Sequence, residues 1–344
     1  MLPAPLLEAI LSGLPSRKIG LVGDLFLDRY LDIDPDLGER SVETGLEAYQ
    51  VTRVRNYPGA LGTVLNNLAA LGAGRLVPVS VLGDDGQAYD LLRELARLPV
   101  DLAHILRDAR RQTPTYTKPL RRDAGGAWHE LNRLDLRNRL PLPADLEDAA
   151  MERAAQAFQA CDATIVLDQV NEEGWGVVTP RVRGQLRKLA AEQPGKLLFV
   201  DSRSQIGRFD FGILKPNREE CLAAIGRAGS DVLAEVRAGA HHLAQRTGRA
   251  VFCTLGELGM LVVRPDGEGA VVPAVRVSGQ IDPVGAGDSA TAGIVAALLG
   301  GADERQAAAF GNLVASITVE QLGVTGTATP EQVRRRWTES GLGN

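Results

Sequence analysis

The sequence predicts an α/β protein in which a mainly parallel β-sheet is flanked by helices and carries a small β lid. Three observations lead to this prediction. Short apolar runs of strand length recur along the 344 residues, stretches with helical period separate them, and two segments follow neither pattern. Continuous apolar strands that alternate with helices are typical of a parallel sheet buried on both faces.

The expected strands and helices follow one another in this order along the chain. Apolar runs typical of strands lie at residues 18–24, 75–85, 163–170, 196–203 and 250–263. Stretches in which apolar residues recur every three or four positions, which indicates amphipathic helices, lie at residues 62–73, 88–98, 146–160 and 230–248.

Polar residues stand at the ends of these runs, namely Asp24, Asp84, Asp168, Asp201 and Thr254. Any one of them could simply cap the helix that follows. In open α/β sheets, however, ligands bind beyond the carboxyl ends of the strands. Five such residues together therefore predict a binding site at that edge.

Residues 27–57 and 113–134 lack the helical period and contain strand-like stretches such as "AYQVTRVRNY" and "TPTYTKPLRRD". We interpret them as a β lid inserted in a single domain that spans residues 1–344, because no internal repeat or long linker is evident. A sheet with one apolar face usually finds a partner. The lid is therefore expected to join two copies of the chain in a homodimer.

Composition narrows the class of protein. The chain is 44% hydrophobic with a formal charge of −5, which argues against a nucleic-acid partner, since phosphate backbones require clustered Lys and Arg. Three widely spaced cysteines indicate a reducing compartment, and no metal-binding spacing occurs. The first residues lack a basic leader and are too short to cross a membrane. The expected location is the cytoplasm, with no membrane partner.

Residues 282–290, "DPVGAGDSA", place a glycine turn at the start of an apolar helix. Free N–H groups and the helix dipole at such a point bind anions, most often phosphate. The stretch formally fits a dinucleotide-binding turn, but the segment before it is polar and contains Pro283. The P-loop pattern is absent from the chain.

Two interpretations of Asp288 remain. It could be an acid that merely stabilises the start of a helix. Alternatively, the N–H groups of Gly285, Ala286 and Gly287 hold a phosphoryl group while Asp288 accepts the proton of an attacking hydroxyl. The second interpretation explains why an acid would stand inside a socket built for an anion.

Several stretches in order carry a family resemblance: "PGALGTVLNNLAALGA" at 58–73, "KPNREE" at 215–220, "TLGELGM" at 254–260 and the loop at 282–290. Over roughly residues 17–329 the sequence resembles the ribokinase (PfkB) family of carbohydrate kinases. Within that family, "GLVGDLFLDRY" and "TPTYTKPL" look most like the kinase domain that acts on a heptose 7-phosphate. The resemblance implies a ribokinase-like fold, with ATP and Mg²⁺ as cofactors and a sugar or sugar phosphate as partner.

The resemblance also implies roles for individual residues. Asp288 would be the catalytic base, with Gly285, Ala286 and Gly287 as the anion hole. Asn217 and Glu220 would help to organise Mg²⁺ and the triphosphate, largely through water. Thr254, Gly256 and Gly259 would line the nucleotide site, and Asn312 would lie near the adenine. Asn217 and Asn312 could instead have only structural roles.

On the substrate side, the residues expected to hold sugar hydroxyls are Asp24, Gly59, Ala60 and Thr63. Lys118 and Arg133 on the lid would meet a substrate phosphate, or else belong to a solvated strand face. Asp282 matches a position that helps to bind a monovalent cation, usually K⁺.

Departures from the family pattern concern the substrate and the cation. Pro283 stands where the family usually has Thr, Ala60 replaces a glycine, and Thr63 replaces an asparagine. Leu61 is larger than the usual alanine and is expected to narrow the pocket. Three alternatives stay open: another sugar, a nucleoside or small alcohol (although 4% aromatic residues disfavour base stacking), and an inactive family member that only binds a sugar.

Overall fold

The computed structural model describes residues 2–123, 125–323 and 325–343, and its main feature is a nine-stranded sheet. The strand order is β16-β15-β14-β13-β12-β11-β1-β6-β7, and all pairs from β14 to β7 are parallel. The strands are β1 (Lys18–Gly23), β6 (Arg75–Gly83), β7 (Ile105–Asp108), β11 (Ala163–Asp168), β12 (Leu197–Ser202), β13 (Ile213–Leu214), β14 (Val251–Thr254), β15 (Met260–Val263) and β16 (Gly269–Val272). This arrangement confirms the predicted α/β class.

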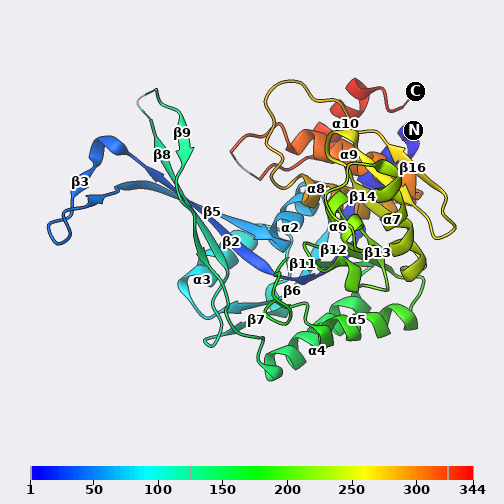
Figure 1. The fold of residues 1–344 in the computed structure, drawn as a ribbon, viewed down its shortest axis with the longest axis horizontal. Helices are drawn as coiled ribbons and strands as arrows, with labels where there is room; N and C mark the ends of the chain where they lie inside the picture. Colours follow the sequence, from blue (N-terminus) through cyan, green and yellow to red (C-terminus); the bar gives the residue numbers. More distant parts are fainter. Residues whose placement is uncertain (1, 124, 324, 344) are drawn as a thin grey trace.

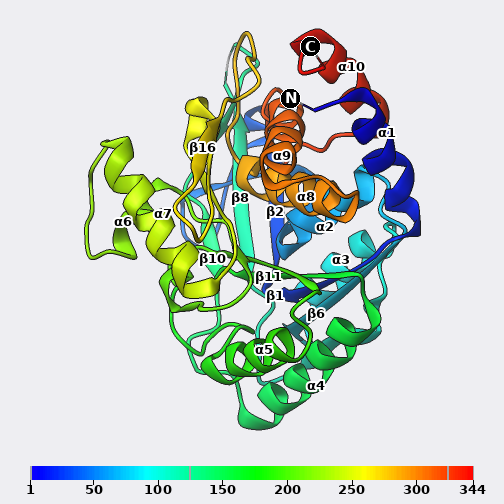
Figure 2. The ribbon, with the colours of Figure 1, turned by 90° about the vertical axis from the view of Figure 1, so that its right-hand side faces the viewer.

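Helices cover both faces of the sheet because its strands are apolar on both sides. Neighbouring residues of one strand point to opposite faces, so Ile165 and Val166 of β11 belong to two separate cores. One core is closed by α1 (Ala4–Gly13), α2 (Leu61–Ala70), α3 (Gly86–Leu95), α8 (Ala286–Leu299), α9 (Glu304–Thr318) and α10 (Pro330–Ser340). The other is closed by α4 (Ala144–Ala160), α5 (Pro180–Glu192), α6 (Arg218–Ala223) and α7 (Leu233–Thr247). Figure 2 shows α8 and α9 on one side of β1, β6 and β11, and α4 and α5 on the other.

A second sheet projects from the carboxyl edge of the first (Figure 1). Its core order is β10-β8-β2-β5, with β9 paired to β8. Its strands are β2 (Leu25–Ile33), β5 (Val51–Ala60), β8 (Thr115–Arg122), β9 (Trp128–Glu130) and β10 (Leu134–Leu136), and a short ribbon of β3 (Glu39–Arg40) and β4 (Glu47–Ala48) lies between β2 and β5. Because β2 starts two residues after β1 ends, the lid arises directly at the edge where a ligand is expected.

The apolar run at 250–263 is two strands rather than one. β14 and β15 pair antiparallel, and the turn between them contains Gly256 and Gly259, with φ angles of +62° and +97°. Those left-handed conformations favour glycine. β15 and β16 therefore form an antiparallel edge on an otherwise parallel sheet.

Two further expectations concern the environment of the chain. Among the described residues, no helix combines the length and the apolar character needed to cross a bilayer. Cys161, Cys221 and Cys253 are buried free thiols.

Candidate active site

A cavity of about 190 Å³ lies where the lid meets the carboxyl edge of the main sheet. It brings together six residues that the sequence predicted: Ala60, Thr63, Lys118, Arg133, Gly285 and Asp288. Its other lining residues are Phe26, Asp28, Tyr116, Gln169, Arg203, Val284 and Thr325. We call this space the acceptor cavity. It places an acid at the start of α8 opposite polar side chains of the lid.

The start of α8 has the geometry of an anion site. Gly285 has a φ of +80°, and a Cβ there would lie 2.9 Å from Thr325 Cγ2, so the turn requires glycine. Within the described ranges, the N–H groups of Gly285 and Gly287 have no hydrogen-bond partner, whereas that of Ala286 donates to Pro283 O at 3.1 Å. Two of the three predicted donors are therefore free, and the third closes the turn.

The surroundings of Asp288 alter its acidity. Burial and the nearby Asp201 carboxylate raise the pKa of Asp288 to about 7, although Lys215 and Arg203 oppose this shift. A carboxyl group with a pKa near neutrality is well matched to accept a proton near pH 7. The geometry and the charge of this residue thus favour a role as base over that of a helix-stabilising acid.

A buried ion pair lies behind this helix start. Asp201 is the penultimate residue of β12, and its Oδ2 atom is 2.9 Å from Nζ of Lys215, which follows β13. The hydroxyl of Thr291 on α8 donates to the same Oδ2 atom at 3.1 Å. The pair therefore connects two strand ends to the helix that carries Asp288.

The lid contributes an acid that sequence reasoning missed. Asp28 of β2 lines the acceptor cavity, 3.5 Å from Nζ of Lys118, which also donates to Tyr30 Oη at 3.0 Å. Burial raises the pKa of Asp28 despite the neighbouring Lys118. A Cβ on Gly59 would lie 2.6 Å from Asp28 Oδ2, so Gly59 makes room for this carboxylate.

Arg133 reaches the acceptor cavity from the segment between β9 and β10. Its guanidinium donates through Nε and Nη2 to Asp135 at 2.7 and 2.9 Å and lies 4.2 Å from the ring centre of Tyr116. Two lid cations, Lys118 and Arg133, therefore flank the cavity, each with an acidic neighbour.

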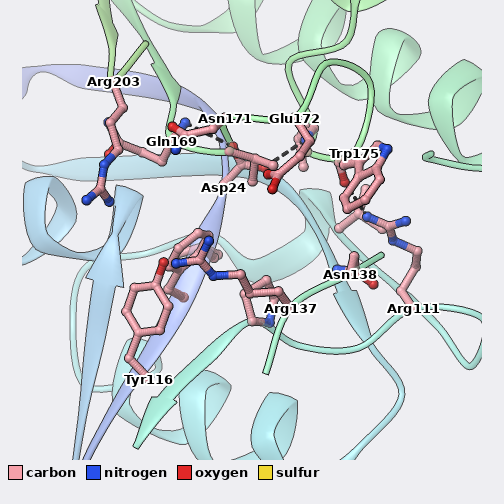
Figure 3. A pocket seen from close by; sticks show the side chains of 17 residues that line it. Asp24, Arg111, Tyr116, Arg137, Asn138, Gln169, Asn171, Glu172, Trp175 and Arg203 are labelled. Atoms are coloured by element: carbon pink, nitrogen blue, oxygen red, sulfur yellow. Dashed lines mark hydrogen bonds between the residues drawn. The ribbon is translucent and has the colours of Figure 1, made fainter. Parts of the chain in front are cut away.

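Asp24 lies outside the acceptor cavity, in an adjoining one of about 70 Å³ (Figure 3). Its carboxylate accepts hydrogen bonds from the N–H groups of Val177 at 2.7 Å and Gln169 at 3.1 Å. Burial raises its pKa, while these bonds oppose the shift. The structure thus separates Asp24 from Asp288 and engages its oxygens with the loop that follows β11.

The two cavities share part of their walls. Phe26, Tyr116, Gln169 and Arg203 line both of them. Of the remaining strand-end residues, Asp168 is buried and accepts from Ser202 Oγ at 2.8 Å, whereas Asp84 is exposed, 3.8 Å from Arg107. The polar residues at the strand ends therefore do not gather in a single cavity. Asp24 lines the smaller cavity, and Asp84 lines neither.

Two residues where β5 joins α2, Ala60 and Leu61, differ from what the sequence led us to expect. Leu61 is fully buried in the core and does not line the acceptor cavity, so the expectation that it narrows the pocket is wrong. Its side chain faces the sheet because it begins a helix that packs there. Ala60, with φ +53° and ψ −118°, is the sole described non-glycine residue with a positive φ, a conformation that strains an L-residue.

The predicted metal and phosphate residues form the start of α6. Asn217 caps this helix by accepting from Glu220 N at 2.9 Å, while the Glu220 carboxylate accepts from Asn217 N and Nδ2 at 2.7 and 3.0 Å. Burial raises the pKa of Glu220 to about 7, with Asp201 adding to the effect. Asn217 therefore has the expected structural role of a helix cap. This helix start lies near Asp201, the carboxylate that adds to the raised pKa of Glu220.

The other nucleotide-side residues lie beside this helix start. Thr254 N donates to Pro216 O at 2.9 Å, which places the end of β14 against α6. Gly259 and Asn312 converge on residues 272–274: a Cβ on Gly259 would lie 2.3 Å from Val272 O, and Asn312 Nδ2 donates to that oxygen at 3.0 Å. Asn312 thus bonds outside its own helix.

Asp282 and Glu220 are the residues predicted to bind a monovalent cation and Mg²⁺, respectively. Asp282 Oδ1 accepts from Val284 N at 3.0 Å, and Oδ2 accepts from Gly323 N at 3.4 Å. Among the described residues no cluster of three or more His, Cys, Asp or Glu side chains forms a direct metal site. Since both Glu220 oxygens already accept N–H groups, Glu220 fits a cation held through water, as Mg²⁺ commonly is.

Comparison with known proteins shows which family model and which relatives the chain matches. Residues 210–332, which contain the Asn217–Glu220 element and the glycine turn before α8, match the model of the pfkB family carbohydrate kinase. The chain is 31% identical over 332 residues to the bifunctional protein HldE of Pelobacter propionicus, covering 95% of this chain and 64% of that protein. Over residues 210–332 the chain therefore carries the pattern of the pfkB family carbohydrate kinases. It spans slightly less than two thirds of the length of that relative.

Solved structures of the same architecture can be superposed on most of the chain. Phosphofructokinase-2 from Escherichia coli in complex with potassium superposes with a TM-score of 0.71 at 18% identity, over 94% of this chain and 99% of that one. Arabidopsis thaliana ribokinase complexed with ribose and ATP gives a TM-score of 0.66 at 15% identity, over 93% and 98%. At these identities the likeness shows a ribokinase-like fold.

Asp28, Arg203 and Lys215 are charged residues of this candidate site that the sequence analysis did not propose. Asp28 lies within the quoted stretch "GLVGDLFLDRY", four residues beyond the end of the expected strand, and alternation along β2 is the signal that could have found it. Arg203 and Lys215 directly follow strands, as the predicted acids do. A search for cations as well as acids at strand ends would have included both.

Proposed function

We propose that this chain is an ATP-dependent kinase that transfers the γ-phosphoryl group to a hydroxyl of a sugar or sugar phosphate. The acceptor oxygen forms the new bond to phosphorus, the bond between phosphorus and the ADP oxygen breaks, and the hydroxyl proton passes to Asp288. The observation that carries this proposal is the position of Asp288 and Gly285 in the acceptor cavity, at a helix start where the N–H groups of Gly285 and Gly287 have no hydrogen-bond partner within the described ranges. Preorganised donors of this kind stabilise charge that develops during transfer.

On the nucleotide side, ATP would lie along Thr254, Gly256 and Gly259, with Asn312 beyond them. Glu220 would hold Mg²⁺ through water, and the ion would supply positive charge to the phosphate oxygens. The Asp201 carboxylate raises the pKa of both Glu220 and Asp288. This concentration of negative charge is what a divalent cation would neutralise. A monovalent cation such as K⁺ would lie by Asp282, at the turn that leads into α8.

On the acceptor side, the two adjoining cavities suit an elongated substrate. Arg137 lies 5.3 Å from the Tyr116 ring centre in the smaller cavity, where its buried Nε atom has no hydrogen-bond partner within the described ranges (Figure 3). Arg203 borders both cavities. A phosphate at the far end of a sugar would be held there while a hydroxyl at the other end faces Asp288, as in a heptose 7-phosphate-like acceptor.

The direct test is ADP release by the purified chain with MgATP and a panel of acceptors. Heptose 7-phosphate, hexose phosphates, the corresponding free sugars and nucleosides should be compared at equal concentration. Sugar-dependent ADP release that Asp288→Asn abolishes supports the proposal. Preference for nucleosides would contradict the acceptor class, and sugar binding without any ADP release would indicate an inactive family member.

The lid supports a further part of the proposal, a homodimer formed with a second copy of this chain. Exposed apolar side chains gather on its strands and their connections: Val42, Leu46, Tyr49, Val51, Val54, Trp128 and Leu134. Surfaces of this kind usually mark contact sites. Burying them between two lids would place the acceptor cavities beside the interface. A cytoplasmic location follows from the need for ATP and agrees with three free thiols.

A further inference from the structure

A buried lysine lies directly behind the proposed anion hole. Lys215 is 5% exposed, and its backbone N–H donates to Val200 O at 2.9 Å, which fixes it beside β12. Its Nζ atom is 2.9 Å from Asp201 Oδ2, and a Cβ on Gly287 would lie 3.6 Å from the same Nζ. The ammonium group therefore lies against the first turn of α8.

This ammonium group has donors to spare. A lysine carries three N–H donors, and the Asp201 carboxylate is the one ion-pair or hydrogen-bond partner that Nζ has within the described ranges. Buried polar groups in proteins are generally hydrogen-bonded, and the N–H donors of Lys215 that do not face Asp201 can bond to further oxygen atoms. Oxygen atoms of a bound group beside Gly287 would supply the missing acceptors.

The charge of Lys215 is secured by its neighbours. Burial by itself lowers the pKa of Lys215. The carboxylates of Asp201, Glu220 and Asp288 together more than offset this effect, so the pKa of Lys215 lies above its ordinary value. The group is thus a fixed cation within reach of the carboxylates that surround the acceptor cavity. Its backbone and its ion pair hold it in place before any ligand arrives.

We propose that Lys215 is a catalytic residue whose Nζ donates to an oxygen of the phosphoryl group being transferred, and that Asp201 is the residue that positions it. This inference rests on the proposed function. Lys215 keeps its proton throughout, while Asp288 takes the proton of the acceptor hydroxyl. The charge on the transferring group is spread over its oxygens, and a preorganised cation stabilises it without reorganisation.

The rival explanation is that Lys215 only neutralises Asp201, which is 8% exposed. Removing one member of a buried ion pair leaves an uncompensated charge, whereas removing both often costs little stability. Three variants therefore separate the explanations: Lys215→Met, Asp201→Asn and the double variant. Lys196→Met is the matched control, because Lys196 lies near the amino end of β12 and donates to Gln159 O at 3.0 Å.

Each variant should be measured for kcat and for KM of ATP with the best acceptor. Calorimetry should give its affinity for ADP alone and for ADP with aluminium fluoride, a mimic of the transferring phosphoryl group. We expect Lys215→Met to lose about 10²–10³-fold in kcat, the effect typical of one lost donor to developing charge. Its affinity for ADP with aluminium fluoride should fall at least tenfold, with ADP affinity unchanged within twofold.

The double variant decides between the explanations, and it carries the test even if Lys215→Met does not fold. We expect it to be stable and still as inactive as Lys215→Met. Recovery of kcat to within about fivefold of the parent would overturn the proposal, as would an equal loss of affinity for ADP with and without aluminium fluoride. If the parent releases no ADP with any acceptor, the proposed function fails, while the aluminium fluoride affinities still judge Lys215.

Discussion

Replacing Asp288 with asparagine should both stop catalysis and stabilise the chain. The substitution keeps the size of the side chain but removes the proton acceptor and the negative charge. Burial and Asp201 raise the pKa of Asp288 to about 7 in the folded chain, whereas an unfolded aspartate titrates near 3.9. Between pH 4 and 7 the unfolded chain therefore ionises at this position before the folded chain does, so the free energy of unfolding falls as pH rises.

The difference of about three pH units corresponds to about 4 kcal/mol of lost stability above pH 7. Because Asp288 is half-buried, solvent screening should reduce this to about 2 kcal/mol. Asparagine carries no charge and escapes the loss. For a chain of this length the gain should raise Tm by about 3 °C at pH 8 and by nothing measurable at pH 4.

Turnover should move in the opposite direction. Loss of a positioned general base lowers kcat by about 10²–10⁴-fold, while ATP affinity stays within twofold. The parent should lose activity below an apparent pKa near 7, because the protonated acid cannot accept the hydroxyl proton. Asp84→Asn is the control, since Asp84 is an exposed strand-end acid outside both cavities. Turnover of Asp288→Asn within threefold of the parent, or a lower Tm at pH 8, would refute the reasoning.

Three further predictions concern the lid, the last residue of β5 and the first turn of α2. Ala60→Gly should raise the free energy of unfolding in urea by about 1 kcal/mol, because glycine relieves the strained φ of +53°; a loss of stability would contradict the strain. Thr63→Asn should change the ratio of kcat/KM between sugars by about tenfold, with KM for ATP constant, because asparagine offers both a donor and an acceptor to the acceptor cavity; unchanged ratios would remove Thr63 from substrate choice. Val54→Lys on the lid should give a monomer by light scattering, whereas Val232→Lys, equally exposed but off the lid, should not; a monomeric parent would exclude the dimer.

Sequence patterns were sufficient for four strands of the main sheet, β1, β6, β11 and β12, whereas β7, β13 and β16 were not expected. Runs such as 163–170 and 196–203 became β11 and β12 because strands buried on both faces must be continuously apolar. The run at 250–263 shows the limit of the same argument. Composition alone does not show where an apolar run turns back, and left-handed glycines at 256 and 259 made it a hairpin.

The loop at residues 282–290 was the part of the candidate site most readily predicted. A glycine turn followed by an acid and an apolar helix fixes its own geometry, so Gly285, Gly287 and Asp288 needed no distant partner to be recognised. The substrate side was harder. Asp24 and Asp28 stand four residues apart, yet Asp24 bonds to the loop after β11 while Asp28 reaches the acceptor cavity.

The sequence by itself determined the order of the elements, the presence of an anion-binding turn and the identity of the acid within it, because these depend on local periodicity and on backbone conformations open to glycine. Tertiary structure alone decided that Lys215 meets Asp201 behind Gly287, and that Leu61 faces the core instead of the cavity. Both facts depend on which strands are neighbours and on how a helix is rotated against the sheet. Those relations arise from packing between segments far apart in the chain, and no local pattern encodes them.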